Sequence, residues 1–211
     1  MLSYPYHLIL GSQSPRRREL LGGLDIPFEV RPIPNIDESY PNTLPLEEVS
    51  EYIAREKADA YRASLSPNDL LITADTTVIV GNEILGKPRN REVAEEMLHK
   101  LSGRTHTVVT GVALTLGQEH SESFSSQSLV TFAPLEESEI DYYLEHYAPY
   151  DKAGSYGVQE WIGYIAVQRI EGSFYNVMGL PVHPLYKALI ALADVFSTPK
   201  CNLEWSSPCS G

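Results

Sequence analysis

Short apolar runs alternate with segments of helical periodicity along the first half of the chain, and Gly, Pro, Asn or Ser separates them. Unbroken apolar runs of this kind predict buried strands, whereas apolar residues spaced at helical intervals predict amphipathic helices. The predicted strands are His7–Leu10, Phe28–Arg31, Leu70–Ala74, Thr77–Val80 and Glu83–Leu85, of which the last two form a hairpin. The predicted helices are Pro15–Leu21, Pro45–Leu65 and Arg91–Leu101.

The second half of the chain turns to longer strands. The predicted elements are the paired strands Thr105–Leu116 and Ser121–Phe132, the helix Glu136–His146, the strand Gly163–Ile170 and the helix Val182–Val195. Because helices and strands alternate first and hairpins follow, we expect an α/β fold with a mixed twisted sheet and flanking helices. Residues 1–196 form the predicted domain, and residues 197–211, which lack periodicity, form a predicted flexible C-terminal tail.

With 211 residues, 43% of them hydrophobic and 21% charged, the chain has the composition of one globular domain or a two-lobed domain. Its N-terminus lacks the basic and apolar segments of a secretory signal, and no apolar run approaches the length of a membrane span. We therefore expect a soluble, cytoplasmic protein with no membrane partner. Cys201 and Cys209 match neither a zinc spacing nor a redox motif, which favours reduced thiols in the tail.

The formal net charge is -12 and the sequence pI is near 4.9. A nucleic-acid-binding protein normally presents a basic face, so we expect no nucleic-acid partner. An acidic protein can still bind a polyanion where its few cations converge on one point together with a metal ion. The positions of the basic residues therefore decide where the chain could bind a polyanion.

The segment Ser12–Arg18 (SQSPRRR) follows the first predicted strand and opens the first predicted helix. A strand, a tight turn and a helix start direct backbone N–H groups at one point, which is the geometry of an anion site. The hydroxyls of Ser12 and Ser14 and the guanidiniums of Arg16 and Arg17 add to this geometry. Three arginines oppose the helix dipole there, so a bound anion would explain them; the alternative is a solvated basic helix start.

Lys57 lies in the middle of the apolar stripe of the second predicted helix. It is either a lysine that extends along the apolar surface towards solvent, or an amine directed into a cleft to meet an anion. Asp75 directly follows the predicted strand Leu70–Ala74, where it can bind a hard cation, take a proton from water, or merely begin a turn. Glu38 is either a second metal ligand or a surface acid.

The stretch Gly81–Lys87 matches the phosphate-binding pattern G-x-x-x-x-G-K, but Pro88 replaces the hydroxyl residue that would hold magnesium. We reject this loop because a hairpin is predicted over the same stretch, and we keep Lys87 as a cation. In Asp151–Gln159 (DKAGSYGVQ), two glycines allow close approach to a ligand or give a flexible connection. Gln159 offers one donor and one acceptor, which match the N3–H and O4 edge of uracil or thymine.

Taken in order, these segments resemble the Maf family of nucleoside triphosphate pyrophosphatases. The motifs are SQSPRR, DE at Asp37-Glu38, REKA around Lys57, ADT at Asp75, GKP at Lys87, SGRTHTVVTGV from Ser102 and DKAGSYGVQ. The last motif is similar to the subgroup that acts on dTTP and UTP, although Glu160-Trp161 follow Gln159 where the pattern implies glycine. The resemblance implies an ITPase-like fold with two lobes around a cleft, a divalent metal and a homodimer.

The resemblance also implies roles for individual residues. Asp75 is the implied proton acceptor, and Arg16, Thr76 and Gln159 set the choice of substrate. The full predicted set is catalytic Asp75, Lys57 and Lys87, substrate-binding Ser12, Ser14, Arg16, Arg17, Thr76 and Gln159, and the metal ligands Glu38 and Asp75. The expected ion is Mg²⁺, with Mn²⁺ as the alternative, and the sequence leaves open whether Asp75 is a general base or a metal ligand.

The function that the resemblance implies is hydrolysis of the pyrimidine nucleoside triphosphates dTTP and UTP to the monophosphate and pyrophosphate, including removal of non-standard nucleotides. Two alternatives stay open. One is a pyrophosphatase for 7-methyl-GTP or with broad specificity, and the other is a non-catalytic nucleotide-binding regulator of septum formation. The intact set of Asp75, Lys57 and Lys87 favours an enzyme, because a pure sensor has no need of the acid.

Overall fold

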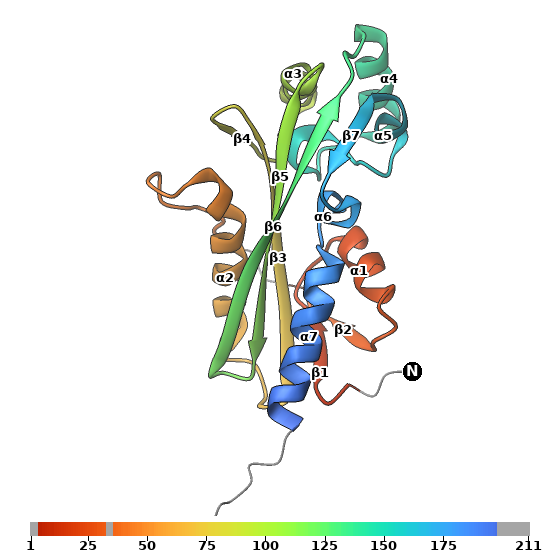
Figure 1. The fold of residues 1–211 in the computed structure, drawn as a ribbon. Helices are drawn as coiled ribbons and strands as arrows, with labels where there is room; N and C mark the ends of the chain where they lie inside the picture. The colour runs from red at the N-terminus through yellow and green to blue at the C-terminus, as the bar shows by residue number, and fades with distance from the viewer. Residues whose placement is uncertain (1–3, 33–35, 198–211) are drawn as a thin grey trace, which may run out of the picture.

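The computed structural model describes residues 4–32 and 36–197, and these form one seven-stranded sheet with helices on both faces (Figure 1). The strand order is β2-β1-β3-β5-β6-β7, with β4 paired to β3. β1 runs parallel to both of its neighbours, and the other pairs are antiparallel. The predicted α/β fold with a mixed sheet is confirmed. The predicted tail with Cys201 and Cys209 lies, apart from Ser197, outside the described residues.

The elements have the following bounds. The strands are β1 His7–Leu10, β2 Phe28–Val30, β3 Asp69–Val80, β4 Glu83–Leu85, β5 Thr105–Leu116, β6 His120–Phe132 and β7 Val167–Glu171. The helices are α1 Pro15–Gly22, α2 Val49–Arg62, α3 Arg91–Leu101, α4 Glu137–Tyr147, α5 Trp161–Ala166, α6 Phe174–Met178 and α7 Val182–Ser197, with 3-10 turns η1 Leu46–Glu48 and η2 Ala153–Ser155. No helix among the described residues is long and apolar enough to cross a membrane.

Strand β3 is longer than the sequence predicts, and this changes the position of Asp75. The apolar run Leu70–Ala74 and the hairpin arm Thr77–Val80 form one strand, so the prediction that Asp75 follows the end of a strand is wrong. β3 stays continuous because β5 pairs along it, with Asp75 opposite Gly111. On the other edge, β1 ends its pairing at Leu10, which leaves that edge of β3 open beside Asp75.

Other elements also differ from the prediction, and the short helix α6 is absent from it. The strand predicted at Gly163–Ile170 begins only at Val167. The residues before it belong to α5, where the N–H of Gly163 donates to the carbonyl of Glu160. Apolar alternation alone does not separate a short buried helix from a strand. The helix predicted at Pro45–Leu65 is shorter at both ends. Its first turn is the 3-10 turn η1, and α2 ends at Arg62.

Helix α2 packs on the long strands β3 and β5 (Figure 1). A Cβ on Gly111 would lie 2.3 Å from backbone atoms of Glu51, so only glycine admits the helix at this point. The hydroxyl of Thr73 on β3 donates to the carbonyl of Ala54 on α2 at 2.7 Å, which fixes the helix to the sheet at a second point. This close packing brings the helix face that carries Lys57 over the middle of β3.

Alternate residues of β3 face two hydrophobic cores. Leu70 and Ile72 belong to the larger core, which α1, α3, α4 and α7 cover. Leu71 points to the opposite face, into a smaller core under α2 that also contains Tyr61. Burial of one such aliphatic side chain stabilises the fold by roughly 2 kcal/mol. The strand that carries Asp75 is therefore anchored from both sides.

Candidate active site

A cleft with a cavity of about 580 Å³ opens where the start of α1, the middle of β3, helix α2 and the loop before α5 meet. Every site residue predicted from the sequence lines this cleft: Ser12, Ser14, Arg16, Arg17, Glu38, Lys57, Asp75, Thr76, Lys87 and Gln159. Cavities of roughly 300–1,000 Å³ are typical of small-molecule and cofactor sites. The fold thus brings one set of predicted residues from distant parts of the chain to one place.

The cleft is locally cationic although the chain is acidic overall. Five lysine or arginine side chains and three carboxylates are found among its lining residues: Arg16, Arg17, Lys57, Lys87, Lys152, Glu38, Asp75 and Asp151. The whole chain, in contrast, carries a formal net charge of -12. A pocket of one sign within a protein of the other concentrates ligands of opposite charge at that pocket. An anionic ligand is therefore favoured.

Lys57 joins the two predicted metal ligands. Its ammonium nitrogen lies 2.7 Å from Oδ1 of Asp75 and 2.8 Å from Oε1 of Glu38. The side chains of Lys57 and Asp75 are only 11% and 13% exposed, whereas Glu38 is 47% exposed. Of the two interpretations of Lys57, the structure agrees with an amine directed into a cleft. Two carboxylates around one ammonium leave a net negative charge, which favours the binding of a further cation.

The carboxyl group of Glu38 is held ionised by its neighbours. Burial works against its charge, but the hydrogen bond from Lys57 and the charges of Lys57, Lys87 and Arg17 outweigh burial. The pKa of Glu38 therefore lies below its ordinary value. At neutral pH this group is a carboxylate, which is the form that binds a cation.

Arg17 ties helix α1 to the sheet. Its Nε donates to the carbonyl of Gly179 at 2.8 Å, Nη1 to the carbonyl of Ala74 at 2.8 Å, and Nη2 to the hydroxyl of Thr76 at 3.0 Å. The bond to Ala74 satisfies a carbonyl on the edge of β3 that β1 has left. Arg17 therefore orders the strand on both sides of Asp75, in addition to any contact that its remaining N–H groups make with a ligand.

The start of α1 has the local geometry that the sequence predicts. Ser14 is the N-cap, and its hydroxyl accepts from the N–H of Arg17 at 3.4 Å. The hydroxyl of Ser12 accepts from the N–H of Ser14 at 3.2 Å, which closes the turn. The guanidinium of Arg16 pairs across the cleft with Asp151 at 3.2 Å. Since Asp151 is 60% exposed, an incoming anion is able to replace it.

The loop Asp151–Gln159 forms the far wall of the cleft and is closely packed. Gly154 has a φ of +67°, and a Cβ there would lie 3.0 Å from the side chain of Val78 on β3. Its N–H donates to the carbonyl of Gly86 at 3.1 Å. This close packing against β3 disagrees with a flexible connection, and close approach of the glycines to a ligand stays a prediction. The bond to Gly86 also connects this wall to the loop that carries Lys87.

The stretch Gly81–Lys87 contains the predicted hairpin. Val80 pairs with Glu83 across a turn in which Gly81 has a φ of +59°. The rejection of a phosphate-binding loop is therefore confirmed. Lys87 follows the hairpin and lines the cleft as a single cation.

His106 and Tyr156, a residue of the far wall, form a buried polar pair. Nε2 of His106 and the hydroxyl of Tyr156 share a hydrogen bond of 2.8 Å, and both rings pack edge-on against Phe132. Burial lowers the pKa of His106 to about 4, so the imidazole is neutral at pH 7. His106 lies within the motif SGRTHTVVTGV, but the sequence predicts no role for it. Its burial had no sequence signal, because the residues beside it in the strand are polar.

A second polar group that the sequence reasoning missed lies at the same wall. Its members are Tyr143, Lys152 and Glu160. Lys152 is 8% exposed and lines the cleft, and its ammonium lies between Asp151 and Glu160. The sequence offers one signal for this group. Glu160 directly follows Gln159, at a position where the family pattern implies glycine.

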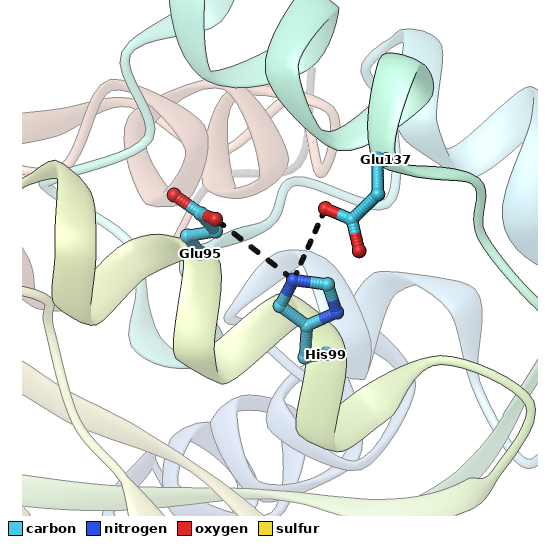
Figure 2. A group of neighbouring side chains, drawn as sticks. All are labelled: Glu95, His99 and Glu137. Carbon is cyan, nitrogen blue, oxygen red and sulfur yellow. Dashed lines mark ion pairs between the residues drawn. The ribbon is translucent and has the colours of Figure 1, made fainter.

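A separate cluster of possible metal ligands lies away from the cleft. Within the described residues, one group of three acidic or histidine side chains has ligand atoms near enough to share an ion: Glu95, His99 and Glu137. Figure 2 shows them on neighbouring helices, with Nε2 of His99 4.0 Å from Glu95 and 3.5 Å from Glu137. The three side chains are exposed or partly exposed, and none lines the cleft. We interpret them as surface contacts, one within α3 and one between α3 and α4, which contribute little to stability.

The sequence model of the family described as "Maf-like protein" matches residues 7–192 of the chain. The chain belongs to the Maf family. The resemblance drawn from the motifs is thereby confirmed, and the match includes the strands, helices and loops that line the cleft.

Two curated relatives of this Maf chain are named dTTP/UTP pyrophosphatase. The one from Porphyromonas gingivalis is 63% identical over 186 residues, which cover 87% of this chain and 93% of its own. The one from Parabacteroides distasonis is 56% identical over 184 residues, which cover 87% of this chain and 95% of its own. Among solved structures, a HAM1 protein from Coxiella burnetii is 15% identical, covers 91% of this chain and 98% of its own, and has a TM-score of 0.49.

Proposed function

We propose that this Maf chain hydrolyses dTTP and UTP between the α- and β-phosphates and releases the nucleoside monophosphate and pyrophosphate. The observation that carries the proposal is the Lys57 ammonium between Asp75 and Glu38, inside a cleft that is cationic overall. The names of the relatives from two organisms support the class of substrate.

The donor set of the cleft fits a divalent cation, and we propose Mg²⁺. Asp75 and Glu38 each bond Lys57 through one oxygen. Carboxylate oxygens are hard ligands of the kind that Mg²⁺ prefers, and a single ammonium does not balance their joint charge. We assign Asp75 and Glu38 as the ligands. A bound Mg²⁺ supplies charge neutralisation to the oxygens of the triphosphate.

Asp75 is the group that we assign to accept the proton of the attacking water. Its backbone lies in the middle of β3 opposite Gly111, and its Oδ1 is held by Lys57, so its position is fixed. The water attacks the α-phosphorus, the bond from that phosphorus to the bridging oxygen breaks, and pyrophosphate leaves. The reacting water gives its proton to the Asp75 carboxylate.

Arg16, Lys57 and Lys87 are proposed to neutralise the charge that moves onto the leaving pyrophosphate. All three line the cleft. Arg16 exchanges its exposed partner Asp151 for a phosphate oxygen when the substrate binds. Loss of one such contact costs on the order of 3 kcal/mol in the transition state, or about a hundredfold in rate.

Gln159 is proposed to recognise the base. Its Oε1 is buried and takes no hydrogen bond from the part of the chain that the structure describes. A buried acceptor without a partner is unfavourable, and the N3–H of uracil or thymine would satisfy it. The apolar side chains of Val78, Val108 and Tyr156 also line the cleft and suit the faces of a planar ring.

The test is pyrophosphate release with Mg²⁺ from dTTP, UTP, CTP, GTP and 7-methyl-GTP, with EDTA added as a control. We expect strong turnover of dTTP and UTP and none with EDTA. Preferential turnover of 7-methyl-GTP would contradict the substrate assignment. No release from any nucleotide, from folded protein with metal present, would contradict the enzyme and favour a nucleotide-binding regulator.

A further inference from the structure

Glu160 lies directly after Gln159, and its side chain is only 19% exposed. Its Oε1 lies 3.1 Å from the ammonium of Lys152, and its Oε2 accepts a hydrogen bond from the hydroxyl of Tyr143. A carboxylate with a cation on one oxygen and a hydroxyl on the other is fixed in one orientation. Both oxygens of the Glu160 carboxylate therefore have a partner.

On one side, this network reaches the backbone that precedes Gln159. The hydroxyl of Tyr143 accepts from the N–H of Gly157 at 3.0 Å while it donates to Glu160. Tyr143 is fully buried, and burial together with the hydrogen bond to Glu160 raises its pKa, so the hydroxyl stays protonated. A Cβ on Gly157 would lie 2.8 Å from Cδ of Glu160 and 3.1 Å from Nε2 of Gln159. Glu160 and the base-reading amide therefore lie against the same glycine.

On the other side, the network holds the ammonium of Lys152, whose side chain is 9% exposed. The second carboxylate partner of Lys152, Asp151, lies 2.8 Å away and pairs with Arg16 at 3.2 Å. Glu160 is therefore two residues removed from the cation that is proposed to face the phosphates. A buried ammonium needs carboxylate partners, and Glu160 is the better shielded of the two that Lys152 has.

We propose that Glu160 is a positioning residue for base recognition, which locks Tyr143 and so fixes the Gly157–Gln159 segment in the orientation that reads uracil and thymine. This inference rests on the proposed function and deepens it. Because the segment contacts the base and not the scissile bond, Glu160 acts on KM and on discrimination between bases, whereas kcat depends on the separate set around Asp75.

The test compares Glu160→Ala, Glu160→Gln and Tyr143→Phe, with Glu171→Ala as the control for loss of a surface acid. We expect Glu160→Ala to raise the KM for UTP about tenfold, which is the upper range for one orienting hydrogen bond, and to lower the UTP-to-CTP ratio of kcat/KM by a similar factor. Its kcat stays within about twofold of wild type. Glu160→Gln, which still offers Tyr143 an acceptor, recovers most of the loss.

Three further readouts separate positioning from a merely structural role. Tyr143→Phe reproduces the change in KM, and Tyr143→Phe/Glu160→Ala is no worse than the larger single change, because both act through one hydrogen bond. Inorganic tripolyphosphate, which lacks a base, inhibits wild type and Glu160→Ala with the same Ki. If Glu160→Ala does not fold, Tyr143→Phe alone replaces it, because it removes the same hydrogen bond and leaves Lys152 paired with Glu160.

A wild-type KM and a wild-type base preference in Glu160→Ala would overturn the inference. So would a tripolyphosphate Ki that rises as much as the KM, or a Tyr143→Phe variant without effect. These outcomes leave the wild-type turnover of UTP intact and so concern Glu160 alone. If wild type itself turns over no nucleotide, the proposed function fails first and this inference fails with it.

Discussion

The replacement Lys57→Met removes the charge that joins Asp75 and Glu38 and keeps the fold. Lys57 lies on the buried face of α2, so an apolar side chain of similar length fits its position. The change takes one cation from the cleft without opening a large cavity. It therefore separates the chemical contribution of the ammonium from its packing.

The expected magnitudes follow from the two short contacts of 2.7 and 2.8 Å. Without the ammonium, two carboxylates face each other, and at an effective dielectric constant of 20 their repulsion is roughly 3–4 kcal/mol. Because Glu38 is nearly half exposed, solvent screening reduces the loss of folding stability to about 1 kcal/mol. The transition state, which gathers more negative charge, loses about 3 kcal/mol, or roughly a hundredfold in kcat.

The assay is the initial rate of pyrophosphate release from UTP over a range of Mg²⁺ concentrations. We expect kcat to fall roughly a hundredfold, whereas the Mg²⁺ concentration for half-maximal rate falls, because the metal no longer competes with the ammonium. Lys100→Met is the matched control, since Lys100 contacts Glu83 at 2.7 Å but is 42% exposed and outside the cleft. A folded Lys57→Met enzyme with kcat within threefold of wild type, or with a raised Mg²⁺ requirement, would refute the reasoning.

Two further predictions concern packing and pH. Gly111→Ala forces α2 away from β5, because its Cβ would lie 2.3 Å from the backbone of Glu51. We therefore expect the unfolding free energy to fall by about 1–3 kcal/mol and kcat to fall as well. Gly22→Ala, whose Cβ meets nothing nearer than 4.0 Å, is the control, and equal stability of the two variants would contradict this prediction. His106 has a folded pKa of about 4, below the unfolded value of 6.5, so the unfolded state binds the proton first and stability is lost as pH falls from about 6.5 to about 4. Between pH 7.5 and 5, wild type should lose about 2 kcal/mol more unfolding free energy than His106→Gln, measured by urea denaturation, and equal losses would show that His106 does not titrate in this way.

Much of the site could be predicted because its residues have local signals. The apolar stripe around Lys57 and the strand, turn and helix start at Ser12–Arg18 both follow from periodicity and turn chemistry within a few residues. The cleft that joins these two segments depends on chain topology, which periodicity does not predict. The resemblance to the Maf family predicted instead that these residues share one site. The predicted residues consequently line one cavity.

The parts that sequence reasoning missed depend on tertiary contacts. Asp75 was placed after a strand because a polar pair interrupts the apolar run, but pairing with Gly111 on β5 carries the strand through it. Arg17 looked like a phosphate ligand, whereas its N–H groups also complete the edge of β3 that β1 leaves. The partners of Glu160 come from α4 and from the start of the loop Asp151–Gln159, and no local pattern connects such residues.

The rate of pyrophosphate release by Asp75→Asn tests the central claim most directly. The amide keeps the size of the side chain and an oxygen for Lys57, but it neither accepts the proton of water nor binds Mg²⁺ as a carboxylate does. With folding verified by thermal denaturation, we expect kcat for UTP to fall by at least about a hundredfold relative to wild type. Turnover near the wild-type rate in a folded Asp75→Asn protein would contradict both roles of Asp75 and, with them, the proposed active site.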